Sequence, residues 1–175
     1  MTRPKVSRLA AARLAAAALA VVLPACHVSN TPPITNTMTI SSPAFGPGAT
    51  IPVRFTCDGA AISPPLTWSG APITAAAVAI VVEDPDAPRG GFTHWILTGI
   101  DARRTSLGEG ERPVGVREGT AGDGQAHYVG PCPPHGKPHH YRFTVYALRR
   151  PAAPTVAAIV ASASPRGRYT ALFGR

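Results

Sequence analysis

The stretch HHYRFTVYAL, residues 139–148, decides the fold class. It is the longest run in the chain that is typical of a β-strand, since it is rich in aromatic and β-branched residues and holds no Gly or Pro. Side chains alternate between the two faces of a strand, so His139 and Tyr141 share one face, followed on that face by Phe143 and Val145. The stretch therefore predicts a strand with polar rings at its start and a buried apolar surface below them.

Working outward from this strand, the sequence predicts a sheet around it. Residues 75–84 are almost continuously apolar, which is typical of a central strand covered on both faces. Ile51 to Thr56 alternates apolar and polar residues, as a half-buried strand does. Further strands are expected at Leu66–Trp68 and Phe92–Ile100, and the one predicted helix is Thr155–Ser164.

The composition agrees with a mainly β, antiparallel domain. Of the 175 residues, 45% are hydrophobic and 15% charged, which is too apolar for a disordered chain. The 20 Pro and 17 Gly argue against a helical bundle, because both residues break helices. No apolar run reaches the roughly 18 residues that span a bilayer, which excludes a polytopic membrane protein.

The N-terminus has the pattern of an export signal. Four basic residues lie before an apolar run, Leu14–Leu23, which ends in Leu23-Pro24-Ala25-Cys26. This ending is similar to a bacterial lipobox, in which the Cys becomes the first residue and carries a lipid such as palmitate. We expect residues 1–25 to be a signal peptide, residues 26–37 a flexible tether and residues 38–175 the folded domain. Plain cleavage into a secreted protein is the alternative.

Removal of residues 1–25 takes away four basic residues and lowers the net charge from +8 to +4. No cluster of Lys and Arg is interleaved with aromatic residues, so we expect no nucleic-acid partner. The remaining mild positive charge suits an anionic ligand or a lipid surface.

Three cysteines are an odd number for an exported chain. If Cys26 carries lipid, Cys57 and Cys132 remain as a pair that would oxidise outside the cytoplasm. Such a disulfide would close a loop of about 76 residues and stabilise the fold by roughly 4 kcal/mol in chain-entropy models. The alternative is two separate buried thiols.

Two Pro-rich loops carry the polar residues of interest. The first, DPDAP at 84–88, precedes His94-Trp95, and a carboxylate at Asp84 could meet His94 across a hairpin and orient or charge it. Asp86 is assigned to the turn. The second loop, GPCPPHG at 130–136, leads into His139.

With these motifs in this order, the sequence resembles the phosphatidylethanolamine-binding protein family, specifically its bacterial Raf kinase inhibitor-like branch. The resemblance also covers FTCDG at 55–59, SPPLTW at 63–68 and the segment up to Phe173. It implies a β-sandwich with a large central sheet and a short C-terminal helix, and a small anion pocket at one edge. Carried over residue by residue, the implied ligand-binding residues are Asp84, His94, Gly130, Pro133, His139 and Tyr141.

The resemblance implies a non-enzymatic, exported and lipid-anchored module of the cell envelope that binds phosphate-type anions or phospholipid headgroups. Some members of the family modulate kinases or proteases by direct contact, but the sequence identifies no protein partner. We expect no cofactor and no metal. Three alternative functions stay open: a surface that inhibits a protease or kinase, a hydrolase with Asp84–His94 as general base, and a metal site formed by His94, His139 and a carboxylate.

Overall fold

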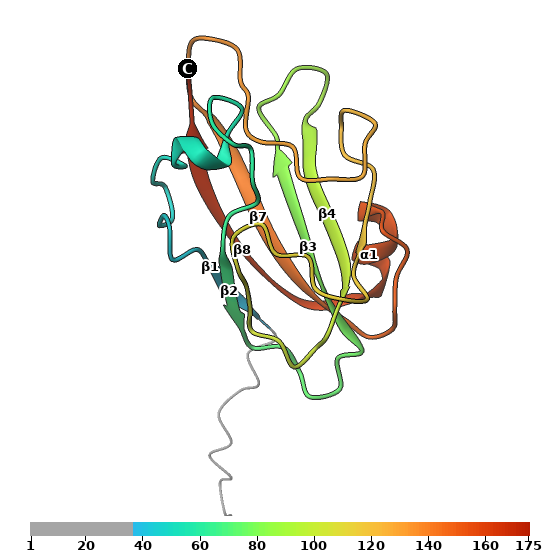
Figure 1. The fold of residues 1–175 in the computed structure, drawn as a ribbon. Helices are drawn as coiled ribbons and strands as arrows, with labels where there is room; N and C mark the ends of the chain where they lie inside the picture. The colour runs from blue at the N-terminus through green and yellow to red at the C-terminus, as the bar shows by residue number, and fades with distance from the viewer. Residues whose placement is uncertain (1–36) are drawn as a thin grey trace, which may run out of the picture. The chain divides into compact units, whose positions relative to one another are not determined.

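The computed structural model describes residues 37–175, which form a mainly β domain with two antiparallel sheets (Figure 1). The larger sheet has the strand order β6-β4-β3-β7-β8 and the smaller has the order β1-β2-β5. In chain order the elements are β1 (Thr39–Ser41), the 3-10 helix η1 (Val53–Phe55), β2 (Leu66–Ser69), β3 (Ala77–Asp84), β4 (Phe92–Ile100), β5 (Ser106–Leu107), β6 (Arg117–Glu118), β7 (His139–Leu148), α1 (Val156–Ser162) and β8 (Ala163–Phe173).

The two faces of the large sheet are covered by different elements, one by the small sheet and the other in part by α1. The main core lies between the sheets, where Val78, Ile80 and Phe143 of the large sheet belong to one cluster with Leu66 and Trp68 of the small sheet. On the other face, Ile159 of α1 packs with the apolar residues of a second cluster. Because β3 is buried on both faces, it reads as a continuous apolar run, as the sequence predicted.

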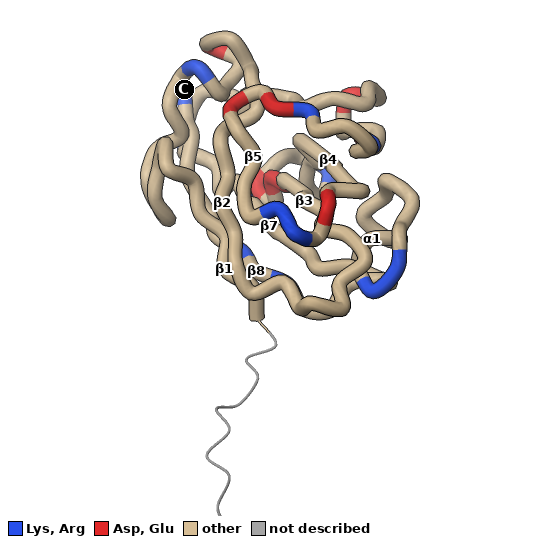
Figure 2. The backbone as a smooth tube through the Cα atoms, turned by 60° about the horizontal axis from the view of Figure 1, so that its bottom comes forward, with Lys and Arg blue, Asp and Glu red and all other residues tan. Residues whose placement is uncertain are grey.

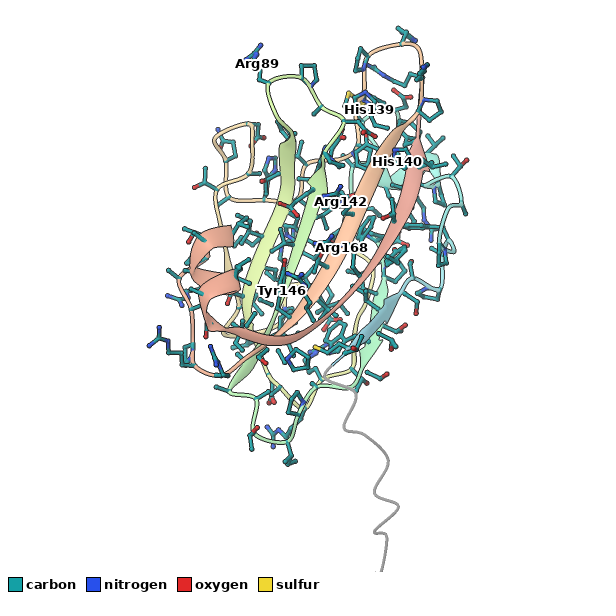
Figure 3. The ribbon with its side chains drawn as sticks, turned by 180° about the vertical axis from the view of Figure 1, so that it is seen from behind. Arg89, His139, His140, Arg142, Tyr146 and Arg168 are labelled. Carbon is teal, nitrogen blue, oxygen red and sulfur yellow. A yellow bond between two sulfur atoms is a disulfide. The ribbon has the colours of Figure 1, made fainter. Side chains whose placement is uncertain are left out.

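Beyond α1, the outer face of the large sheet is polar. Seen from behind, Arg142 of β7 and Arg168 of β8 lie on this face, above Tyr146 (Figure 3). The side chain of Arg168 donates to Thr144 Oγ1 at 3.2 Å, and Arg142 lies opposite Glu83 in the strand register. Polar groups on neighbouring strands thus replace a covering layer here.

The strand predicted at Ile51–Thr56 is wrong, because the chain turns there into η1. The amide of Phe55 donates to Pro52 O, and that of Thr56 donates to Val53 O. Ile51 and Phe55 are both fully buried whereas Val53 is exposed, so the buried pair is four residues apart. A separation of four residues fits one helical turn. Within only six residues, an alternating pattern of apolar and polar residues can belong to a strand or to a helical turn, so the sequence did not distinguish them.

The predicted helix is confirmed as α1, but the strand that follows it, β8, was not predicted. Thr155 caps the helix by accepting a hydrogen bond from Ala158 N at 3.2 Å. In β8 the buried residues alternate from Pro165 through Gly167 and Tyr169 to Phe173. The period of two is therefore present in the sequence. Gly167 is needed there, because a Cβ would lie 2.2 Å from Met38 O.

A disulfide joins Cys57 and Cys132, whose Cα atoms lie 5.3 Å apart. It connects the segment after η1 to the segment before β7, and Cys57 N donates to Pro131 O beside it. No helix in residues 37–175 is long and apolar enough to cross a membrane. Cys26, the predicted signal peptide and the predicted tether lie outside the described residues, apart from Thr37.

Replacement of both disulfide cysteines by Ser should lower the free energy of unfolding by about 4 kcal/mol, because the oxidised chain loses less entropy on folding. Urea unfolding of the oxidised protein and of the Cys57→Ser/Cys132→Ser variant measures the difference. Cys26→Ser is the control and should leave the free energy unchanged. A loss below about 1 kcal/mol in the double variant would contradict a stabilising role.

Candidate functional site

A pocket of about 250 Å³ lies where β3 ends and β7 begins. The turn after β3, the start of β4 and the segment that precedes β7 close it from three sides. Its lining residues are Asp84, Ala87, Pro88, Phe92, His94, Val129, Gly130, Cys132, Pro133, Pro134 and His139. Five of the six predicted ligand-binding residues are among them, and the exception is Tyr141.

The carboxylate of Asp84 organises the pocket although it is only 3% exposed. Its Oδ1 accepts hydrogen bonds from the amides of Asp86 at 2.8 Å and Ala87 at 3.1 Å. Its Oδ2 accepts one from His139 Nδ1 at 2.8 Å. Three N–H donors therefore offset the cost of burying this charge, and they tie the DPDAP turn to the first residue of β7.

His139 thus has a fixed orientation. A carboxylate oxygen accepts, so Nδ1 of His139 carries the proton in this contact, and Nε2 lies on the opposite edge of the ring. The side chain is 13% exposed and lines the pocket. An imidazole held in this way keeps one nitrogen for a ligand.

His94 owes its position to a β-bulge. In the pairing of β3 with β4, Val82 lies opposite Trp95 and Glu83 lies opposite Thr93, which leaves His94 as the extra residue. The bulge lets two neighbouring residues face inward, with His94 at the pocket and Trp95 in the main core. Simple alternation would put Ile96 on the same face as His94, but Ile96 belongs to the second core under α1.

The hydrogen bond that holds His94 is not the predicted one. Its Nδ1 donates to Val129 O at 2.8 Å, whereas the carboxylate of Asp84 is bonded to His139. Asp84 therefore does not orient His94 through a hydrogen bond, although its charge still acts to raise the pKa of that ring. Burial lowers the pKa of His94, which favours a neutral ring with a lone pair on Nε2.

Tyr141 lies behind the pocket, not in its lining. Its ring centroid is 5.2 Å from that of His94, and the side chain is fully buried. Burial, with a further contribution from the Asp84 carboxylate, raises the pKa of the phenol. Its hydroxyl has no hydrogen-bond partner in the described part of the chain. Tyr141 supports the His94 ring from below.

The segment at 129–134 forms a rigid wall opposite the histidines. Gly130 is required because a Cβ would lie 2.9 Å from the carbonyl carbon of Thr56. The disulfide fixes Cys132, and Arg175 Nε donates to Pro133 O at 2.8 Å. The sequence reasoning missed Arg175, since nothing in its local pattern places the end of the chain beside this wall.

A second carboxylate–histidine pair lies beside the pocket. Asp86 Oδ2 accepts hydrogen bonds from the amide and from Nδ1 of His140, at 2.8 and 2.6 Å. His140 points away from the face that carries His139, and the two are seen at the upper end of β7 in Figure 3. Hydrogen bonds to His140 lower the pKa of Asp86. This exposed pair holds the turn against β7. Neither of its residues lines the pocket, whereas Asp84 and His139 both do.

The pocket combines two oriented imidazoles with apolar walls. The walls come from Ala87, Pro88, Phe92, Val129 and the prolines, none of which offers a side-chain polar atom. The lining includes no Ser or Thr, and its one cysteine is in the disulfide. Within residues 37–175, no group of three or more His, Cys, Asp or Glu side chains is arranged to hold a metal ion.

Comparison with known proteins agrees with this architecture. The family model described as phosphatidylethanolamine-binding protein matches residues 41–171. A UPF0098 protein of Mycobacterium bovis is 49% identical over 135 residues, which are 77% of this chain and 64% of that protein. A Mycobacterium tuberculosis protein named "Putative lipoprotein LppC" is 45% identical over 150 residues, covering 81% of this chain and 74% of the relative.

Among solved structures, Escherichia coli YbcL, described as a member of the mammalian PEBP family, superposes with a TM-score of 0.73 at 31% identity. The match covers 79% of this chain and 98% of YbcL. The family model, the sequence relatives and the fold thus agree. The chain belongs to the phosphatidylethanolamine-binding protein family.

Proposed function

We propose that this protein is an exported, lipid-anchored binding module that takes a small anionic ligand of the phosphate class into the pocket at the end of β3. The single observation that carries the proposal is the pair of imidazoles in the lining. Each donates its Nδ1 proton to a fixed acceptor, Val129 O for His94 and Asp84 Oδ2 for His139. In both rings Nε2 is therefore the nitrogen left for a ligand, and it donates to an anion when the imidazole carries a proton on each nitrogen.

The surroundings of the imidazoles favour an anion of limited size. A cavity of about 250 Å³ accepts a phosphate with a short substituent, and the apolar walls suit the substituent. The Asp84 charge is already offset by three N–H donors, so its repulsion of an anion is reduced. Prolines at 133 and 134 keep the wall stiff, which lowers the entropy lost on binding.

Binding without hydrolysis is the function that the lining supports best. A covalent mechanism needs a nucleophile next to a base, and the lining offers no hydroxyl or free thiol. Asp84 and His139 form a base-like pair, but with no nucleophile beside it the pair serves to hold the His139 ring in one orientation at the pocket.

Replacement of His94 by Ala should weaken the binding of inorganic phosphate and of phosphoethanolamine at least tenfold, about 1.4 kcal/mol, because one of the two ligand-binding nitrogens is lost. Isothermal titration calorimetry measures both ligands. His135→Ala is the matched control, since His135 is exposed and outside the lining. Equal affinity in the His94 variant would rule out this pocket.

Anion binding should strengthen as the pH falls. Burial lowers the pKa of His94 in the empty pocket, and an anion beside Nε2 raises it, so binding takes up a proton. Affinity is then greatest below the pKa of the empty pocket and is lost as the pH rises through the pKa of the complex, by up to about tenfold per pH unit. Sulfate is the suitable titrant, because its charge is constant from about pH 8 to about pH 5. A slope that survives in His94→Gln would assign the proton to another group.

The lipid anchor is proposed at Cys26, on the basis of the lipobox-like sequence and the lipoprotein name of LppC. Mass spectrometry of the protein from its own envelope should find an N-terminal Cys26 with an acyl mass added. The Cys26→Ser variant is the control and should carry no such mass. A mature chain that begins at another residue, or at an unmodified Cys26, would show release in place of anchoring.

A further inference from the structure

The end of the domain opposite the pocket exposes two apolar side chains. Ile73, before β3, and Val114, before β6, are 101% and 104% exposed. Both line one shallow groove, together with Gly99 and Arg103. We call this end, made of residues 70–76, 101–104, 112–116 and 149–150, the basal face. β3 runs from it to the pocket, a length of about 26 Å for its eight residues.

The basal face is also basic. Arg149 and Arg150 are exposed and come directly after Leu148, the last residue of β7. The carbonyl oxygen of Leu148 accepts a hydrogen bond from Ala76 N, which joins the end of β7 to the loop before β3. Within residues 37–175, neither of these two arginines forms an ion pair, whereas Arg103 pairs with Asp101 at 2.6 Å. Figure 2, which turns this end forward, shows the blue segment of the connection beside α1. Each unpaired arginine near an anionic lipid surface strengthens attachment by about fivefold.

The chain enters the described domain at this same end. Thr37 forms a bridge with Arg166, and Met38 N donates to Arg166 O at 3.2 Å. A Cβ on Gly70 would lie 2.9 Å from Thr37 O, so the entry point borders the loop that carries Ile73. The eleven residues from Cys26 to Thr37 span at most about 40 Å. A domain of this size has a radius of gyration of about 14 Å, so a lipid on Cys26 brings the basal face to the bilayer more readily than the pocket.

We propose that the basal face docks on an anionic phospholipid surface, with Ile73 and Val114 in the interfacial layer and the arginines among the headgroups. The proposal rests on the lipid anchor of the proposed function, but not on the ligand of the pocket. Apolar side chains at loop tips beside basic residues are the combination that binds such an interface. The pocket then opens away from the bilayer, and its ligand comes from the aqueous phase.

Tryptophan quenching tests this orientation. The full chain is coupled through Cys26, the one cysteine outside the disulfide, to maleimide lipid in vesicles of phosphatidylglycerol and phosphatidylcholine with brominated acyl chains. Coupling uses protein whose Cys26 is unmodified, so the test does not depend on acylation in cells. Ile73→Trp reports the basal face. Val53→Trp is the matched reporter at the other end, since Val53 is 55% exposed in η1, near the disulfide and the pocket wall. Trp68 and Trp95 are buried and give the background in the unsubstituted protein.

The brominated vesicles should quench the added fluorescence of Ile73→Trp at least twofold and leave that of Val53→Trp unchanged. The quenching should fall when Arg149 and Arg150 are both replaced by Glu, or when phosphatidylcholine replaces the anionic lipid. Quenching of Val53→Trp alone would mean that the pocket faces the bilayer, and quenching of neither would mean that the domain stays off it; both results overturn the proposal. A failure of phosphate binding in calorimetry leaves this experiment unaffected, so the two proposals fail separately.

Discussion

The pocket depends on one buried carboxylate. Asp84 stands at the end of the central strand, where a bare charge would be strongly destabilising, and it is stabilised there by two amides of its own turn and by the imidazole of His139. The same contacts set the shape of the turn, join it to β7 and orient the imidazole. Without the carboxylate, the turn amides and the ring would each lose their acceptor. The geometry of one wall therefore follows from the need to satisfy one charge.

In the other walls, backbone groups supply the hydrogen bonds that hold the side chains and segments in place. Val129 O orients His94, and the bulge at His94 makes that contact compatible with a buried Trp95 in the next position. The disulfide and the hydrogen bond from Cys57 N to Pro131 O hold the segment that carries Val129. A site built from such fixed groups changes little when a ligand arrives, so most of the interaction energy is available for binding.

The domain has two chemically different ends. One end holds the pocket, with the Asp84–His139 pair in its lining and the Asp86–His140 pair beside it. The other exposes Ile73 and Val114 beside Arg149 and Arg150, which form no ion pair within residues 37–175, and it also holds Thr37, where the described chain begins. The strands β3, β4 and β7 connect these ends as a rigid body, so contacts at the basal face determine the direction in which the pocket opens. If the basal face docks on a bilayer as proposed, the pocket opens toward the aqueous phase.

The sequence alone determined the class of the fold, the central strands β3, β4 and β7 and the helix α1, and it predicted the pairing of Cys57 with Cys132 and five of the residues that line the pocket. Each of these depends on local periodicity, on the count of cysteines or on motifs that resemble the family. Tertiary structure alone decided that Asp84 bonds to His139 and not to His94, that residues 53–55 form a helical turn, and that Tyr141 lies behind the pocket. The physical reason is that hydrogen-bond partners and bulges are chosen by the distance between chain segments in space. Alternation along one strand carries no information about which neighbouring segment will come closest.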